Sequence, residues 1–171
     1  MVIRQEHPSD YDEVYRLVKI SFATAAHSDG TEADYLNGLR EKDTFIPELS
    51  LVAALDGKLA GQVVLYKTDI TTPDRIITEL VLSPICVHPD YFRRGIARAM
   101  IEEALQIALR LGYTAVFLCG EPEIYRKLGF TPSYEFGIYH ITDKTQHAGW
   151  CMVRALVPGA LDGIMGTINI E

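Results

Sequence analysis

One strand–turn–helix–strand unit limits the folds open to this chain more than any other feature. Residues 76–87 read as a long strand, residues 94–111 carry the apolar stripe of an amphipathic helix, and residues 114–119 form a short apolar strand. A crossover through a helix places the two strands parallel. Because a fully apolar strand belongs in the centre of a sheet, the unit predicts a sheet with a parallel pair.

The residues before this unit indicate antiparallel strands. Two stretches with strand composition, 49–55 and 59–69, flank Asp56-Gly57, a dipeptide typical of a two-residue hairpin turn. Another turn then leads into the next strand. The predicted fold class is therefore α/β with a mixed, mostly antiparallel sheet and helices on both faces. The sequence contains no internal repeat or linker, so we expect a single domain over residues 1–171.

Charge and hydropathy exclude several classes of protein. The chain carries 16 basic and 23 acidic residues, a net charge of −7. This balance argues against a nucleic-acid partner, because such proteins usually carry a basic face. No apolar run approaches the ~20 residues of a membrane span, and the first residues do not read as a signal peptide. We therefore expect a cytoplasmic protein with neither a membrane nor a nucleic acid among its partners.

The cysteines show neither metal-ligand spacing nor a disulfide framework. Cys86, Cys119 and Cys151 are far apart in the sequence, and each lies among apolar residues. No histidine is paired with any of them by motif, so we expect reduced, inert thiols in the core and no metal site. Trp150, beside the last cysteine, is also expected in the core.

Ser83-Pro84 interrupts the long strand at 76–87. Proline has no N–H to donate to a sheet, so a proline inside a strand predicts a bulge or a splay from the neighbouring strand. A splayed strand exposes unpaired N–H and C=O groups that a ligand can use. The alternative is a bulge without a role in ligand binding.

The turn after this strand has the composition of a phosphate-binding loop. Arg93, Arg94 and Gly95 precede the helix, where unpaired N–H groups and a partial positive charge attract anions. Gly95 and Ala97 let a ligand approach the backbone closely. The alternative is a strand-to-helix turn with solvated arginines.

Three segments together resemble the GNAT superfamily of acyl-CoA-dependent N-acetyltransferases. Residues 84–89 are similar to the strand end of the family, and residues 92–97 are similar to its phosphate loop, Gln/Arg-x-x-Gly-x-Gly/Ala. Residues 125–130, Tyr-Arg-Lys-Leu-Gly-Phe, match the Tyr-x-x-x-Gly-Phe of the family. The resemblance covers about residues 2–156 and leaves residues 157–171 as a C-terminal extension.

The resemblance implies a twisted sheet with a splayed parallel pair and acetyl-CoA as co-substrate. The backbone of Ile85 and Val87 would pair with the pantetheine arm, and the N–H near Ile85 would face the thioester carbonyl as an oxyanion donor. The loop would hold the pyrophosphate mainly through backbone N–H groups. Phe92 replaces the usual Gln or Arg, so neighbouring arginines would supply the charge. The implied cofactor-binding residues are Ile85, Cys86, Val87, Arg93, Arg94, Gly95, Ile96, Ala97 and Arg98.

Two residues are candidates for the chemistry. In the family, the tyrosine that matches Tyr125 donates a proton or a hydrogen bond to the departing thiolate, and the alternative is a core tyrosine. A phenol of pKa ~10 is a poor full proton donor to a thiolate of pKa ~8.5, so a strong hydrogen bond suffices. Glu79 would act as a general base through a water, and the alternative is an ordinary strand-end carboxylate. Glu121 and Glu135 are further candidates for the base.

These features predict an N-acetyltransferase. It would move the acetyl group of acetyl-CoA directly to an amine of a small molecule or peptide, with both substrates bound. The alternative is a regulator or sensor that binds acyl-CoA without catalysis. The sequence leaves the oligomeric state open, with a homodimer as one of the two arrangements: the tail after Leu156 either packs on a partner or folds back on its own domain.

Overall fold

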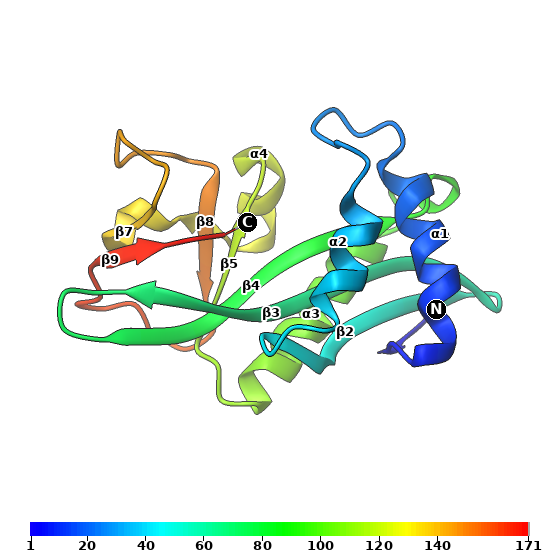
Figure 1. Cartoon of the computed structure of the whole chain (residues 1–171), viewed down its shortest axis with the longest axis horizontal. Helices are drawn as coiled ribbons and strands as arrows, with labels where there is room; N and C mark the ends of the chain where they lie inside the picture. Colours follow the sequence, from blue (N-terminus) through cyan, green and yellow to red (C-terminus); the bar gives the residue numbers. More distant parts are fainter. Residues whose placement is uncertain (171) are drawn as a thin grey trace. The chain divides into compact units, whose positions relative to one another are not determined.

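The computed structural model, drawn in Figure 1, describes residues 1–170. Within them, nine strands belong to one mixed sheet. The chain forms two compact units, each built from two stretches: Met1–Tyr66 with Ser83–Ile107 in the first, and Lys67–Leu82 with the chain from Ala108 onward in the second. The single domain expected from the sequence stays a prediction.

The first unit begins with three antiparallel strands. β1 (Val2–Gln5) pairs with β2 (Phe45–Leu55), and β2 pairs with the first part of β3 (Lys58–Thr71). The predicted hairpin is confirmed, because Asp56 and Gly57 form the turn between β2 and β3. Their φ values of 51° and 77° are those that a two-residue hairpin turn requires.

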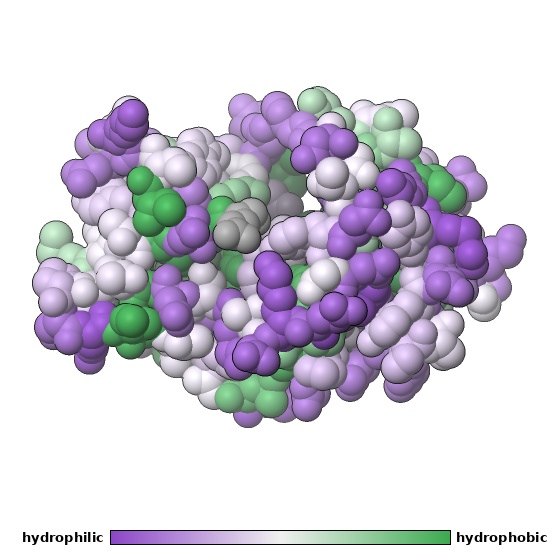
Figure 2. Space-filling model, viewed as in Figure 1, coloured by the Kyte–Doolittle hydropathy of each residue, from purple (hydrophilic) through white to green (hydrophobic). Residues whose placement is uncertain are grey.

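Three helices accompany these strands. They are α1 (Tyr11–Phe22), α2 (Glu32–Leu39) and α3 (Ile96–Arg110), whose last residues belong to the second unit. Figure 2 shows a mainly hydrophilic surface over α1 and α2, whereas their apolar residues at helical spacing are buried. No helix among residues 1–170 has the length and apolar character needed to cross a bilayer.

Helices cover both faces of β3, as predicted. The hydroxyl of Tyr66 on β3 is 2.7 Å from the hydroxyl of Tyr35 on α2. A Cβ atom on Gly61 of the same strand would instead meet the side chain of Met100 on α3. Side chains alternate along a strand, so positions 61 and 66 point to opposite faces. It follows that α2 and α3 pack on opposite faces.

The second unit contains the parallel pair that the crossover predicts. β4 (Ile76–Val87) and β5 (Ala115–Cys119) pair in parallel, with Leu80 opposite Val116. Both of these side chains are fully buried, as expected for a sheet centre. The pairing lies before Pro84, and β4 continues through the proline to its end in the first unit.

The rest of the second unit consists of short elements. α4 (Pro122–Tyr125) follows β5, and β8 (Cys151–Ala155) pairs with β5 in antiparallel fashion. β6 (Thr131–Pro132) pairs with β8, and β7 (Ile138–His140) pairs in parallel with β9 (Gly166–Ile168). The sequence predicts β5, but β6, β7 and β9 have only two or three residues each and are too short to give a periodic signal.

The C-terminal tail folds back on the second unit. Ile168 lies opposite Ile70 in the antiparallel pairing of β9 with β3, and its side chain is fully buried. The N–H of Ile170 donates to Nε2 of His140 at 3.2 Å. Of the two arrangements expected for the tail, folding back is therefore confirmed, and the homodimer stays a prediction.

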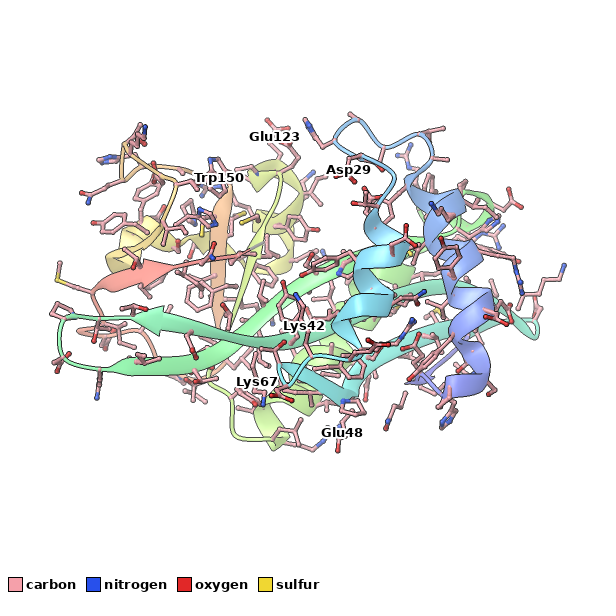
Figure 3. All side chains as sticks on the ribbon, in the orientation of Figure 1. Asp29, Lys42, Glu48, Lys67, Glu123 and Trp150 are labelled. Atoms are coloured by element: carbon pink, nitrogen blue, oxygen red, sulfur yellow. The ribbon has the colours of Figure 1, made fainter. Side chains whose placement is uncertain are left out.

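Two residues expected in the core lie at the surface. Trp150, labelled in Figure 3, precedes β8 and is 40% exposed, with its ring against that of His140 at a centroid distance of 5.0 Å. Cys119 is exposed because it is the last residue of β5, where the chain leaves the sheet. Cys86 and Cys151 are buried, as predicted.

Candidate active site

The end of β4 presents backbone groups on the side away from β3. The N–H of His88 donates to the C=O of Ala60 on β3 at 2.8 Å. The backbone N–H and C=O groups of successive residues point alternately to the two sides of a strand, so those of Cys86, two residues before His88, also point to β3. The N–H and C=O groups of Ile85 and Val87 therefore point to the opposite side, which is the direction that pairing with an extended ligand requires.

The thiol of Cys86 is not a reactive group, so this residue can contribute to the site only through its backbone. Its side chain is buried in the first unit, near Ser21 and Gln62. Burial raises the pKa of the Cys86 thiol to about 11. The group is protonated at neutral pH, which agrees with the inert thiol predicted for this position.

The chain between β4 and α3 makes a tight turn followed by two left-handed residues. The N–H of Tyr91 donates to the C=O of His88 at 2.9 Å and closes the turn. Arg93 and Gly95 then adopt φ values of 63° and 76°. Successive N–H groups in such a turn can point to one side and form a concavity that binds anions.

α3 begins directly after this turn. Its first hydrogen bond runs from the N–H of Ala99 to the C=O of Gly95 at 3.0 Å. The N–H groups of residues 95–98 precede that bond and lie at the helix end that attracts anions. A Cβ atom on Gly95 would meet no atom within 4 Å, so the approach to these donors is open. The side chain of Ile96 is buried and anchors the first turn of the helix to the core.

The loop and the first turn of α3 carry three exposed arginines. Arg93, Arg94 and Arg98 are exposed, and the guanidinium carbon of Arg94 lies 5.4 Å from the ring centroid of Tyr91. Phe92 is 54% exposed and supplies no polar group. The backbone donors and three guanidinium groups suit a diphosphate, because guanidinium groups form strong charge-assisted hydrogen bonds with phosphate oxygens. The composition of this loop therefore fits the pyrophosphate of CoA.

Tyr125 ends α4 in the second unit. Its ring packs edge-on against Phe130 at a centroid distance of 6.0 Å, and the N–H of Phe130 donates to the C=O of Tyr125 at 3.1 Å. Gly129, between them, has a φ of 82°, which explains the glycine of this motif. Burial raises the pKa of the Tyr125 phenol, so the group stays protonated and able to donate at neutral pH.

Gly120 holds a position that sequence reasoning missed. A Cβ atom there would collide with the ring of Tyr125, so only glycine leaves the ring in place. The N–H of Gly120 donates to the C=O of Trp150 at 2.8 Å. The available signal was a glycine between an apolar strand and a helix that starts with proline.

Glu79 supports the start of β5. Its carboxylate accepts the N–H of Thr114 at 3.0 Å, the N–H of Ala115 at 3.1 Å and the hydroxyl of Thr114. The side chain is 8% exposed. These contacts occupy both carboxylate oxygens, and they favour the alternative of a structural carboxylate over a base.

We expect Glu79→Ala to lower the free energy of unfolding by about 2–3 kcal/mol, because it leaves buried N–H donors at the start of β5 without a hydrogen-bond acceptor. Glu79→Gln keeps one acceptor oxygen and should lose less. Chemical denaturation measures both effects. If Glu79 is only structural, kcat of the folded variants stays within a few-fold of wild type. A drop of ~100-fold in kcat for a stable Glu79→Gln protein would instead identify a base.

The structure places the predicted site residues in two groups. Residues 85–87 and 93–98 lie in the first unit, and Tyr125 and Glu79 lie in the second. Glu121 and Glu135 also belong to the second unit, and Glu121 precedes α4, on which Figure 3 labels Glu123. Among residues 1–170, no cluster of three or more His, Cys, Asp or Glu side chains is arranged to hold a metal ion.

Comparison with protein families gives a match over most of the chain. The family described as acetyltransferase (GNAT) domain matches residues 2–133. This range exceeds half of the sequence, and the protein therefore belongs to the GNAT acetyltransferase family.

Individual relatives agree with this assignment. The chain is 31% identical over 170 residues to the uncharacterized N-acetyltransferase YhbS of Escherichia coli K12, covering 99% of this chain and 95% of YhbS. A crystal structure of E. coli YhbS in complex with CoA superposes with a TM-score of 0.86 and 27% identity, over 99% of this chain and 89% of that one. A GNAT acetyltransferase from Brucella melitensis has the same fold, with a TM-score of 0.79, 24% identity, and coverage of 99% and 95%.

Proposed function

We propose that this protein transfers the acetyl group of acetyl-CoA to an amine of a small molecule or peptide. The observation that carries the proposal is the loop at residues 93–98, where two left-handed residues lead into the open first turn of α3. The complex of YhbS with CoA supports the same co-substrate for this related chain.

Acetyl-CoA binding is assigned to the backbone as much as to side chains. The N–H groups of residues 95–98 and the guanidinium groups of Arg93, Arg94 and Arg98 would hold the pyrophosphate. The outward backbone groups of Ile85 and Val87 would pair with the pantetheine arm in the manner of an added strand. The N–H of Ile85 would then donate to the thioester carbonyl as negative charge develops on its oxygen.

Tyr125 is proposed to assist the leaving group. The amine attacks the thioester carbon while both substrates are bound, and the C–S bond breaks to release the CoA thiolate. A protonated phenol can stabilise that thiolate with a hydrogen bond, and the raised pKa of Tyr125 keeps the phenol protonated. The ring packs against Phe130 and lies so close to Gly120 that a Cβ atom there would collide with it.

The acceptor must reach the thioester as a neutral amine. A lysine-like amine of pKa ~10.4 is only about one part in 2,500 neutral at pH 7, whereas an α-amine of pKa ~7.8 is more than one part in ten neutral. Because the surroundings of Glu79 favour a structural carboxylate, we propose no protein base. An α-amine or another weakly basic amine is then the acceptor class that reacts fastest near neutral pH.

The test combines binding with turnover. Thermal unfolding is measured with acetyl-CoA, CoA, ATP and NAD, and a ligand at ~100 times its dissociation constant adds about 2.7 kcal/mol of stability. Release of free CoA is then followed over a panel of α-amino peptides, polyamines and small primary amines. We expect stabilisation by acetyl-CoA and CoA only, with turnover on at least one amine. Stabilisation without turnover on any amine would support the non-catalytic regulator, and no stabilisation would contradict the proposal.

A further inference from the structure

Cys119 and Cys151 face each other across two neighbouring strands. Cys119 is the last residue of β5, Cys151 is the first residue of β8, and the antiparallel register places them directly opposite. The flanking hydrogen bond runs from the N–H of Gly120 to the C=O of Trp150, one residue further along. Bonded and non-bonded pairs alternate, so the two cysteines form a non-hydrogen-bonded pair, in which opposing side chains come closest.

This geometry suits a covalent link between the strands. A non-hydrogen-bonded pair has a Cα separation of about 4.5 Å, and disulfides span Cα separations of roughly 4.4–6.8 Å. Both side chains also point to the same face of the sheet, because directly opposite residues of an antiparallel pair do so. A disulfide could form here without moving the backbone far.

The surroundings give the two thiols different roles. Cys119 is exposed, whereas Cys151 is buried and its Sγ accepts the hydroxyl of Ser133 at 3.3 Å. Cys151 accepts a hydrogen bond from the Cys119 thiol, so its sulfur can take up the Cys119 proton as Cys119 reacts. An oxidant can reach the exposed sulfur of Cys119, and the sulfur of Cys151 lies opposite it.

We propose that Cys119 and Cys151 are a modification site that forms a reversible cross-strand disulfide on reaction with a hydroperoxide. The sulfur of Cys119 attacks the peroxide, breaks the O–O bond and becomes a sulfenic acid, and the peroxide leaves as an alcohol or water. The sulfur of Cys151 then attacks the sulfenic acid, a water leaves, and the S–S bond forms. Two thiols lose two electrons and two protons, and the hydroperoxide is reduced.

Cys86 is the internal control for this reaction. It lies in the first unit, it is buried, and burial raises the pKa of its thiol to about 11. A buried thiol that peroxides cannot reach reacts slowly with them. We therefore expect Cys86 to stay reduced while the other two thiols are oxidised.

The experiment oxidises the folded wild-type protein with hydrogen peroxide and counts free thiols and intact mass. We expect two of the three thiols to be lost, the mass to fall by two hydrogen atoms, and dithiothreitol to restore both. Trypsin should release residues 111–126 joined to residues 145–154. Retention of all three thiols, or addition of oxygen to Cys119 without the joined peptides, would overturn the proposal.

Two variants test whether the two thiols lost on oxidation are those of Cys119 and Cys151. Cys86→Ala should oxidise like wild type and end with no free thiol, because it keeps both members of the pair. Cys151→Ala should leave Cys119 without a partner, so that oxidation adds oxygen or joins two chains and forms no internal disulfide. Formation of an internal disulfide in Cys151→Ala would show that Cys86 takes part and would contradict the assignment. None of these measurements depends on acetyl transfer.

Discussion

Gly95→Glu is expected to weaken acetyl-CoA binding at least ~100-fold while the chain still folds. The substitution places a carboxylate beside the N–H groups of residues 95–98, where the pyrophosphate would otherwise lie. Repulsion between like charges a few ångströms apart near a protein surface is worth about 3 kcal/mol, which corresponds to that factor. Isothermal titration with acetyl-CoA measures the effect directly.

Gly57→Glu is the matched control for this prediction. Gly57 has a φ of 77°, against 76° for Gly95, and a Cβ atom would meet nothing within 4 Å at either position. Both variants thus carry the same cost of about 1 kcal/mol for a left-handed non-glycine residue, and both belong to the first unit. Equal dissociation constants of the two variants for acetyl-CoA would show that the loop at 93–98 does not bind this ligand.

Tyr125→Phe is expected to lower kcat about 100-fold and to leave KM for acetyl-CoA within about three-fold of wild type. The change removes only the hydroxyl and keeps the ring against Phe130. Positioned proton or hydrogen-bond donors contribute 10²–10⁴-fold to such reactions. Because burial raises the pKa of Tyr125 above its ordinary value near 10, ionisation of this phenol should cause no loss of wild-type rate between pH 7 and 9.

Tyr113→Phe provides the comparison. Tyr113 lies two residues before β5, and Tyr125 ends α4, the helix that follows β5. Burial, with a contribution from the charge of Glu79, raises the pKa of the Tyr113 phenol too. We expect the Tyr113 variant to retain kcat within about two-fold. A similar loss in both variants would indicate a general effect on the second unit, and no loss in Tyr125→Phe would exclude the proposed role.

Local signals predicted the parts of the fold that depend on neighbouring residues. The dipeptide Asp56-Gly57 predicted the hairpin turn in which it lies. The helical crossover from β4 through α3 to β5 predicted the parallel pairing of these two strands. The loop at 93–98 was recognisable because its glycine and its arginines are adjacent in sequence.

Features that depend on pairing between distant segments could not be predicted in the same way. The contact of Glu79 with Thr114 requires the register of β4 against β5, and the opposition of Cys119 and Cys151 requires the register of β5 against β8. A shift of one residue would turn either set of side chains to the other face. Trp150 was expected in the core, whereas β8 begins only at Cys151 and the Trp150 side chain before it is 40% exposed.

The place of β9 in the sheet has a consequence for the order in which the chain is made. Ile168 pairs with Ile70, although Ile70 leaves the ribosome long before Ile168 is translated. Until then the end of β3 at Ile70 and Thr71, and the whole of β7, lack their pairing with β9, and such unpaired strand edges can associate with other chains. The second unit therefore completes its sheet only after β9 is translated, whereas β1, β2 and the first part of β3 can pair much earlier.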